Sequence, residues 1–152
     1  MTTGTRYVHT NLIARDWRRL AAFYAAVFGC RPAGPERDLA GQWLDRLTAL
    51  ENAHIAGLHL SLPGCDNGPT LEIFSYRPAD PAAGQPQLNG PGLAHLAFHV
   101  DDVAATLRQI LAAGGGQVGE LVVNDYGALG VLTVVYARDP EGNILEIQHW
   151  QK

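Results

Sequence analysis

Four side chains in this sequence of 152 residues could together hold a divalent transition metal: His9, Glu72, His95 and Glu146. Each glutamate stands between a leucine and an isoleucine in a strand-like segment. Successive strand residues point to opposite faces of a sheet, so aliphatic neighbours that pack against a helix leave the glutamate on the other face. Imidazole nitrogen and carboxylate oxygen suit Zn, Ni, Co, Mn or Fe(II). We therefore expect a metal site built from four separate strands.

The strands that carry the histidines alternate in the same way. Leu96 and Phe98 share the face that packs against a helix, so His95 and His99 face away from it. Where two such sheets pair, their helix-free faces form a cleft, and all four candidate ligands point into it.

The four residues recur because the chain contains an internal repeat. Residues 9–29 align without a gap with residues 95–115, at an offset of 86 (95 − 9), and residues 68–73 align with 142–147 at an offset of 74 (142 − 68). The first copy is therefore longer by 12 residues (86 − 74), which we place within 31–57. One His and one Glu in each copy predict a pseudo-twofold site.

Each copy reads as a strand, a helix and three further strands. Behind Asp16 and Asp102, both good N-cap residues, apolar side chains recur at a spacing of three to four, as one helix face requires. Gly29 and Gly114 mark the ends of these helices. The expected strands are 6–13, 57–63 and 70–76 in the first copy and 94–100, 131–137 and 143–149 in the second, with further strands near 42–50 and 117–123.

The pattern predicts an α+β fold in which two tandem βαβββ modules form a cup-shaped mixed β-sheet with helices on the outside. We expect residues 1–152 to form a single domain, with module 1 over about 6–77 and module 2 over about 93–150. The segment 78–92 has four prolines and three glycines and reads as the linker between them.

Composition narrows the class of protein. A hydrophobic content of 47% and a charged content of 17% indicate a folded globular chain. The formal net charge of −4 gives no reason to expect nucleic acid or an anionic membrane as partner. The start has no signal-peptide pattern, and the two cysteines, Cys30 and Cys65, read as reduced packing residues. We expect a cytoplasmic protein that acts on a small molecule.

Further side chains are expected to line the substrate pocket, either because they share the face of the candidate ligands or because they lie in a loop near it. The loop 124–130 is rich in turn-forming residues and would act as a lid, with Tyr126 as its contact residue. The expected pocket residues are Asn11, Ile13, His59, Ser61, Phe74, His99, Tyr126, Ile144 and Gln148.

Three segments, HTNLIARDWRRLAAFYAAVFG, GLAHLAFHVDDV and ARDPEGNILEI, resemble the vicinal oxygen chelate superfamily. That group includes glyoxalase I, methylmalonyl-CoA epimerase, extradiol dioxygenases, fosfomycin-resistance enzymes and bleomycin-resistance proteins. The resemblance covers almost the whole chain and implies paired βαβββ modules around a metal, usually in a homodimer. The family's ligands correspond to His9, His95, Glu72 and Glu146, a set most similar to that of glyoxalase I.

The resemblance implies a metal-dependent lyase or isomerase in which a glutamate moves a proton on a substrate with adjacent oxygens. We assign that role to Glu146 first and Glu72 second. Glutathione-using bacterial members often have Arg and Asn where this chain has Ile13 and Tyr76. An isoleucine cannot form a charge-assisted bond to a carboxylate, so we do not expect a glutathione adduct as substrate.

Three other functions are compatible with the sequence. The first is an Fe(II) extradiol-type dioxygenase, which would need three ligands and an open site, and against which Glu72 argues as a fourth ligand. The second is an epimerase of thioesters or small oxyacids. The third is a small-molecule binding protein without chemistry. The ligand set is compatible with several divalent metals and with a site supplied by one chain or by two.

Overall fold

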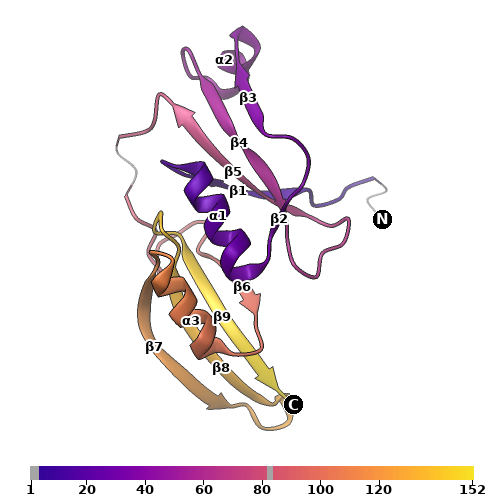
Figure 1. The fold of residues 1–152 in the computed structure, drawn as a ribbon, viewed down its shortest axis with the longest axis vertical. Coiled ribbons are helices and arrows are strands. Elements are labelled where there is room, and N and C mark those ends of the chain that lie inside the picture. The colour runs from indigo at the N-terminus through magenta and orange to yellow at the C-terminus, as the bar shows by residue number, and fades with distance from the viewer. Residues whose placement is uncertain (1–3, 82–83) are drawn as a thin grey trace. The chain divides into compact units, whose positions relative to one another are not determined.

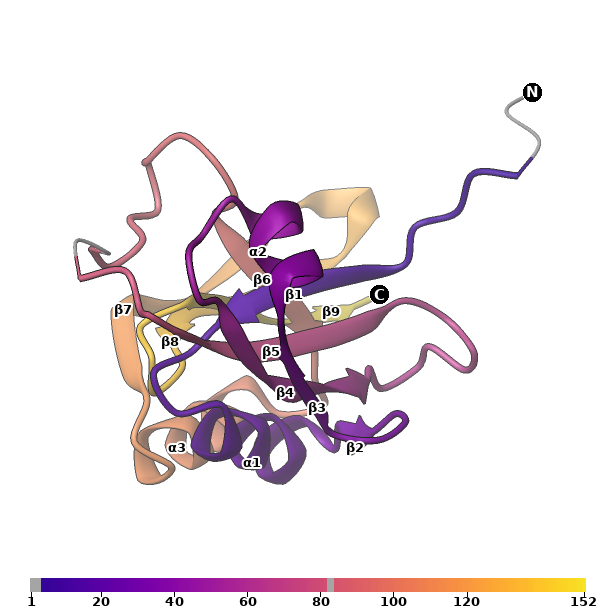
Figure 2. The same cartoon turned by 90° about the horizontal axis from the view of Figure 1, so that it is seen from above.

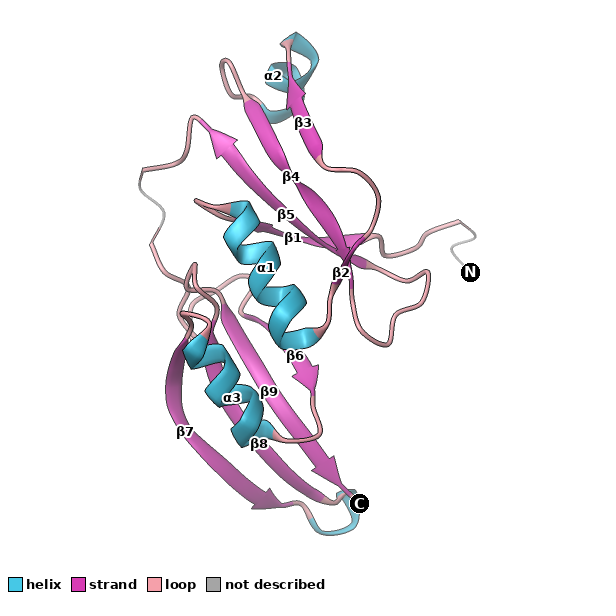
Figure 3. Ribbon diagram, viewed as in Figure 1, coloured by secondary structure: helices cyan, strands magenta, loops and turns pink. Residues whose placement is uncertain are grey.

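The computed structural model describes residues 4–81 and 84–152 and has an α+β architecture, as predicted. The chain divides into two compact units, residues 1–82 and residues 83–152, and each unit contains its own β-sheet (Figures 1 and 3). Two residues of the expected linker, 82 and 83, lie outside the described residues. The extent of that linker and the single-domain assignment stay predictions.

Unit 1 is a mixed sheet with one long and one short helix. Its strand order is β1-β5-β4-β2, with β3 paired to β4; β1 runs parallel to β5, and the other pairs are antiparallel. Its elements are β1 (His9–Ile13), α1 (Trp17–Phe28), β2 (Arg31–Pro32), β3 (Arg37–Ala40), α2 (Gln42–Thr48), β4 (His54–Ser61) and β5 (Thr70–Arg77).

Helix α1 begins and ends where the sequence predicts. The carboxylate of Asp16 accepts a hydrogen bond from the backbone N–H of Arg19 at 3.1 Å, which satisfies one free donor of the first turn. At the other end, Gly29 has φ 72°, a conformation that glycine adopts without steric cost. Leu20 and Tyr24 are fully buried on this helix, which packs against β4 and β5.

The alternation of β5 decides which residues face α1. Leu71 and Ile73 are fully buried, while the side chain of Glu72 between them keeps part of its surface exposed. The strand therefore has an apolar face toward the helix and a second face that carries the glutamate. This confirms the predicted parity of β5.

The second helix of unit 1 corrects the prediction of a strand near 42–50. That segment folds as α2, which lies on the opposite side of the sheet from α1 (Figure 2). Leu44 of α2 packs with Ile55 and Phe74, both of which belong to the glutamate face. The expected strand is instead provided by β3, so the longer first copy includes a helix that covers one end of the glutamate face.

Unit 2 is a βαβββ module with a four-stranded sheet of order β6-β9-β8-β7, in which β6 runs parallel to β9. Asp102 caps its helix by accepting a hydrogen bond from the backbone N–H of Ala105 at 2.8 Å. The strand expected near 117–123 is confirmed. The elements are β6 (His95–His99), α3 (Val103–Ala112), β7 (Gly116–Asp125), a short 3-10 helix η1 (Gly127–Leu129), β8 (Val131–Arg138) and β9 (Ile144–Gln151).

The turn before β9 is held by one buried carboxylate. Asp139 accepts hydrogen bonds from the backbone N–H groups of Glu141 (2.9 Å) and Asn143 (3.0 Å) and from the side-chain amide of Asn143 (2.8 Å). Gly142 in this turn has φ 93°, which disfavours any side chain. The turn fixes where β9 starts, so that Leu145 and Ile147 are buried and Glu146 takes the other face.

The helices are short. The longest of them, α1, has 12 residues. Within residues 4–81 and 84–152, none combines the length and the apolar character needed to cross a membrane.

The two cysteines differ in accessibility, which a thiol reagent can measure. Burial raises the pKa of the Cys30 thiol to about 11, whereas Cys65 is partly exposed. At pH 8 only about a thousandth of a thiol with that pKa is the reactive thiolate. We expect Ellman's reagent to modify one thiol per native chain and two after addition of guanidinium. Cys65→Ser should abolish the native reaction; two rapidly reacting thiols in the native chain would contradict the burial of Cys30.

Candidate metal centre

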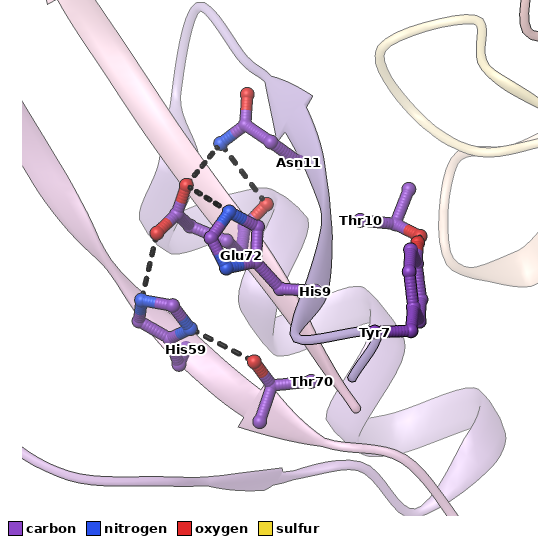
Figure 4. Close-up of polar contacts among 7 residues, drawn as sticks. All are labelled: Tyr7, His9, Thr10, Asn11, His59, Thr70 and Glu72. Carbon is purple, nitrogen blue, oxygen red and sulfur yellow. Dashed lines mark hydrogen bonds and ion pairs between the residues drawn. The ribbon is translucent and has the colours of Figure 1, made fainter. Parts of the chain in front are cut away.

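The first histidine–glutamate pair lies on two adjacent strands of unit 1. Strands β1 and β5 run parallel with Asn11 opposite Glu72, so His9 and Asn11 both reach the carboxylate from β1. The Nε2 atom of His9 lies 3.4 Å from Oε1 of Glu72, and the Asn11 amide donates to the same oxygen at 2.9 Å (Figure 4). The predicted pairing of His9 with Glu72 within the first copy is thus present in the folded unit.

A second histidine joins this pair from β4. His59 is the cross-strand partner of Glu72, and its Nε2 lies 2.7 Å from Oε2 of that glutamate (Figure 4). Its other ring nitrogen, Nδ1, is 2.9 Å from the hydroxyl of Thr70. The sequence placed His59 among the pocket residues, and the structure brings it into direct contact with a predicted ligand.

These three residues form a potential ligand cluster. The donor atoms of His9, His59 and Glu72 all lie within 4.8 Å of one another, and the described residues contain no other such group of three or more. Their side chains are 37%, 17% and 12% exposed, so the cluster is shielded but open to solvent on the His9 side. Two imidazoles and a carboxylate are suitable ligands for a divalent transition metal.

The second pair lies in unit 2 and has a different neighbour. His95 Nε2 is 3.3 Å from Oε2 of Glu146, nearly the distance of the first pair. Tyr136, the cross-strand partner of Glu146 on β8, donates its hydroxyl hydrogen to the same oxygen at 2.9 Å. Tyr136 thus takes the position that His59 has in unit 1. The sequence analysis did not identify Tyr136 as a site residue. Its cross-strand pairing with Glu146 was the signal that could have found it.

His95 has one polar atom without a partner. Its Nδ1 is buried and makes no hydrogen bond within the described part of the chain, while Nε2 points to Glu146. The ring therefore presents one nitrogen toward the carboxylate, the orientation that a metal ligand of this unit would need.

The remaining pocket candidates of unit 1 occupy separate places. Ile13, at the end of β1, is 51% exposed. The Ser61 hydroxyl donates to the backbone carbonyl of Arg31, and the ring of Phe74 packs edge-on to His59 at 6.3 Å between centroids. Of the predicted pocket residues in this unit, Asn11 and His59 form polar contacts with Glu72.

The pocket candidates of unit 2 make other contacts, since the polar partners of Glu146 among the described residues are Tyr136 and His95. His99 stacks on His149, with ring centroids 5.1 Å apart. Tyr126 is exposed and its ring lies against Trp150, whose indole N–H donates to Gln148. Ile144 is buried. Pocket roles for these residues stay predictions, as does the convergence of both histidine–glutamate pairs on one metal.

A family model described as the Glyoxalase/Bleomycin resistance protein/Dioxygenase superfamily matches residues 6–147. A glyoxalase domain-containing protein of Mycosarcoma maydis is 36% identical over 72 residues, or 47% of this chain. The match spans 39% of the length of that relative.

Solved structures with the same fold come from several bacteria. A glyoxalase family protein from Bacillus cereus gives a TM-score of 0.83 at 17% identity, covering 100% of this chain and 99% of that one. A fosfomycin resistance protein from Listeria monocytogenes, solved with Mn(II) and sulfate, gives 0.56 at 14% identity, covering 99% and 95%. At these identities the likeness concerns the fold.

The contact between Tyr136 and Glu146 predicts a late-ionising tyrosine. The pKa of Tyr136 lies above its ordinary value of 10.0, first because its hydroxyl donates to Glu146 and second because of burial. The folded chain therefore holds this proton more tightly than the unfolded chain, so the stabilisation is present below the ordinary pKa and is lost as pH rises through the folded value.

We expect the difference between the absorbance titrations of the unaltered chain and of Tyr136→Phe at 295 nm to show a single ionisation with a midpoint above 10. Glu146→Gln should move that midpoint back toward the ordinary value because the charge of the acceptor is gone. A Tyr136 midpoint at or below 10 in the unaltered chain would contradict the hydrogen bond.

Proposed function

Because the chain belongs to the glyoxalase/bleomycin resistance protein/dioxygenase superfamily, we propose that it is a metal-dependent lyase or isomerase of the glyoxalase type. It moves a proton on a small substrate whose two adjacent oxygens bind a divalent ion of Ni, Zn, Co, Mn or Fe. The proposed ligands are His9, Glu72, His95 and Glu146.

One observation carries the proposal: the same histidine–glutamate pair occurs in both units. The Nε2-to-carboxylate distances are 3.4 Å in unit 1 and 3.3 Å in unit 2. Imidazole nitrogen and carboxylate oxygen on neighbouring strands are donors that divalent transition metals accept. The Mn(II) in the fosfomycin resistance protein, which has the same fold, also supports an ion of this kind.

A divalent metal in this site would supply Lewis-acid polarisation of the substrate oxygens. The protein's part is proton transfer. A carboxylate near the reacting carbon accepts the C–H proton and returns it to the neighbouring carbon, so that one C–H bond breaks, one forms and no oxidant is needed.

Glu146 suits this role better than Glu72. Both oxygens of Glu72 are engaged, Oε1 by Asn11 and Oε2 by His59. In Glu146, by contrast, the Tyr136 hydroxyl and Nε2 of His95 both contact Oε2. Oε1 of Glu146 has no hydrogen-bond partner among the described residues of unit 2. A free carboxylate oxygen is able to take a proton, while the bond from Tyr136 holds the group in place.

The pocket residues favour a substrate without glutathione. Ile13 offers no cation to a substrate carboxylate, and Tyr76 packs against the cluster of Leu44, Ala53, Ile55 and Phe74. We propose a small, compact substrate instead. We also propose that the protein is a cytoplasmic homodimer; two free cysteines are compatible with a reducing compartment.

The first test is metal content. We expect elemental analysis of protein purified without added metal to find a divalent transition ion near one per chain, and Glu72→Gln to lower that content. If the chain contains no bound ion and does not bind added Ni, Co, Mn, Zn or Fe, the protein is instead a metal-free binding protein. Bound iron with oxygen consumption on catechols would favour the dioxygenase reading.

The second test measures proton transfer. In D₂O, the metal-loaded chain should exchange the carbon-bound hydrogen of dihydroxyacetone or of the methylglyoxal adduct of 2-mercaptoethanol, as measured by proton NMR. Glu146→Gln should slow exchange by roughly 10²-fold or more, the usual contribution of general acid–base catalysis, while keeping the metal. The control is Glu120→Gln, an exposed change on β7. Unchanged exchange in Glu146→Gln would remove Glu146 from the role of base.

A further inference from the structure

Unit 1 contains a third potential ligand that unit 2 does not repeat. His59 and Tyr136 occupy equivalent positions, each opposite the glutamate of its unit across an antiparallel strand pair. A tyrosine there donates a hydrogen bond to Glu146, whereas the histidine offers a nitrogen close to Glu72 and His9. The two units are therefore alike in their His–Glu pair and differ in the next residue along the site.

The ring of His59 is held so that Nε2 points into the cluster. Its Nδ1 lies 2.9 Å from the Thr70 hydroxyl on the neighbouring strand, and its Nε2 lies 2.7 Å from Oε2 of Glu72. Metal-bound histidines typically have such a partner on the second nitrogen, which fixes the ring orientation. Asn11 does the same for the carboxylate by donating to Oε1 of Glu72.

The contact between His59 and Glu72 requires a positive charge or a proton between the two atoms. A nitrogen lone pair and a carboxylate oxygen at 2.7 Å repel each other unless a proton or a cation lies at the contact. A proton would satisfy only this pair. A divalent cation would also satisfy Nε2 of His9, which lies 3.4 Å from Glu72. Two neutral imidazoles and one carboxylate would carry a net charge of −1 toward that cation.

We propose that His59 is a further metal ligand, added to the four of the proposed function, and that the three donors of unit 1, His9, His59 and Glu72, are enough to retain a divalent cation. The inference rests on the proposed metal dependence of this site. It assigns retention of the metal mainly to the donors of unit 1. It also places Thr70 as the residue that positions the His59 ring.

The test is Co(II) binding to the metal-free, full-length chain, measured by isothermal titration calorimetry. His59→Ala should weaken the dissociation constant at least tenfold, as should His9→Ala and Glu72→Gln. His95→Ala and Glu146→Gln should change it by less than the His59 variant does. The matched control is His54→Ala, because His54 lies on the same strand and contacts Asp38 and Arg77 instead.

A second variant separates ligation from folding. His59→Gln keeps a side chain able to hydrogen-bond with Thr70 and Glu72 but lacks the imidazole nitrogen, so it should fold as the unaltered chain does and bind Co(II) as weakly as His59→Ala. Circular dichroism and thermal unfolding of the metal-free variants check the fold. In proton NMR of the Co(II)-loaded chain, the exchangeable, paramagnetically shifted N–H signal of one imidazole should disappear in both His59 variants.

The outcomes distinguish this inference from the proposed function. If both His59 variants bind Co(II) as tightly as the unaltered chain while Glu72→Gln does not, His59 only forms a hydrogen bond and the inference is wrong, although metal dependence stands. If His95→Ala abolishes binding, unit 1 does not hold the metal alone and the inference is also wrong. If the unaltered chain binds none of Co, Ni, Zn, Mn and Fe, the proposed function itself fails.

Discussion

In each unit, side chains along one strand alternate between the two faces of the sheet, and both sites depend on this constraint. In β5 and β9 a glutamate stands between two fully buried aliphatic residues, and the helix of the unit covers the aliphatic face. Burying an unpaired carboxylate on that face would cost several kcal/mol, so Glu72 and Glu146 must take the other one. A shift of register by one residue would exchange the two faces completely. In unit 2, the turn held by Asp139 fixes where β9 starts and so helps to keep that register.

The two units share a His–Glu pair on equivalent strands and differ in the other residues that contact the carboxylate. Both place a histidine from the first strand near the glutamate, but unit 1 adds Asn11 and His59, while unit 2 adds Tyr136. The first environment holds a carboxylate by both oxygens, and the second leaves one oxygen free. The two carboxylates therefore have different surroundings, which is why the proposed function gives them different roles.

Much of this arrangement could be predicted from the sequence because the chain repeats its own pattern. The caps at Asp16 and Asp102 and the faces of Glu72 and Glu146 follow from local spacing, and the structure bears them out. Helix α2 was missed because it has only 7 residues and starts at Gly41 without a side-chain cap, and because its contact with Phe74 is long-range. Tyr136 and the role of His59 depend on cross-strand register, which spacing along one strand does not reveal.

The three residues of the unit 1 cluster are separated by very different distances along the sequence. His59 and Glu72 are 13 residues apart (72 − 59) on adjacent antiparallel strands, whereas His9 is 63 residues from Glu72 (72 − 9) on a parallel edge strand. Closing a longer loop costs more entropy, and parallel pairing forms slowly. During folding, the β4–β5 hairpin should therefore form before β1 docks, an order that φ-values at positions 9 and 59 would reveal. A cation captured by the hairpin would then favour the docking of β1, so that metal availability would influence how quickly the unit folds.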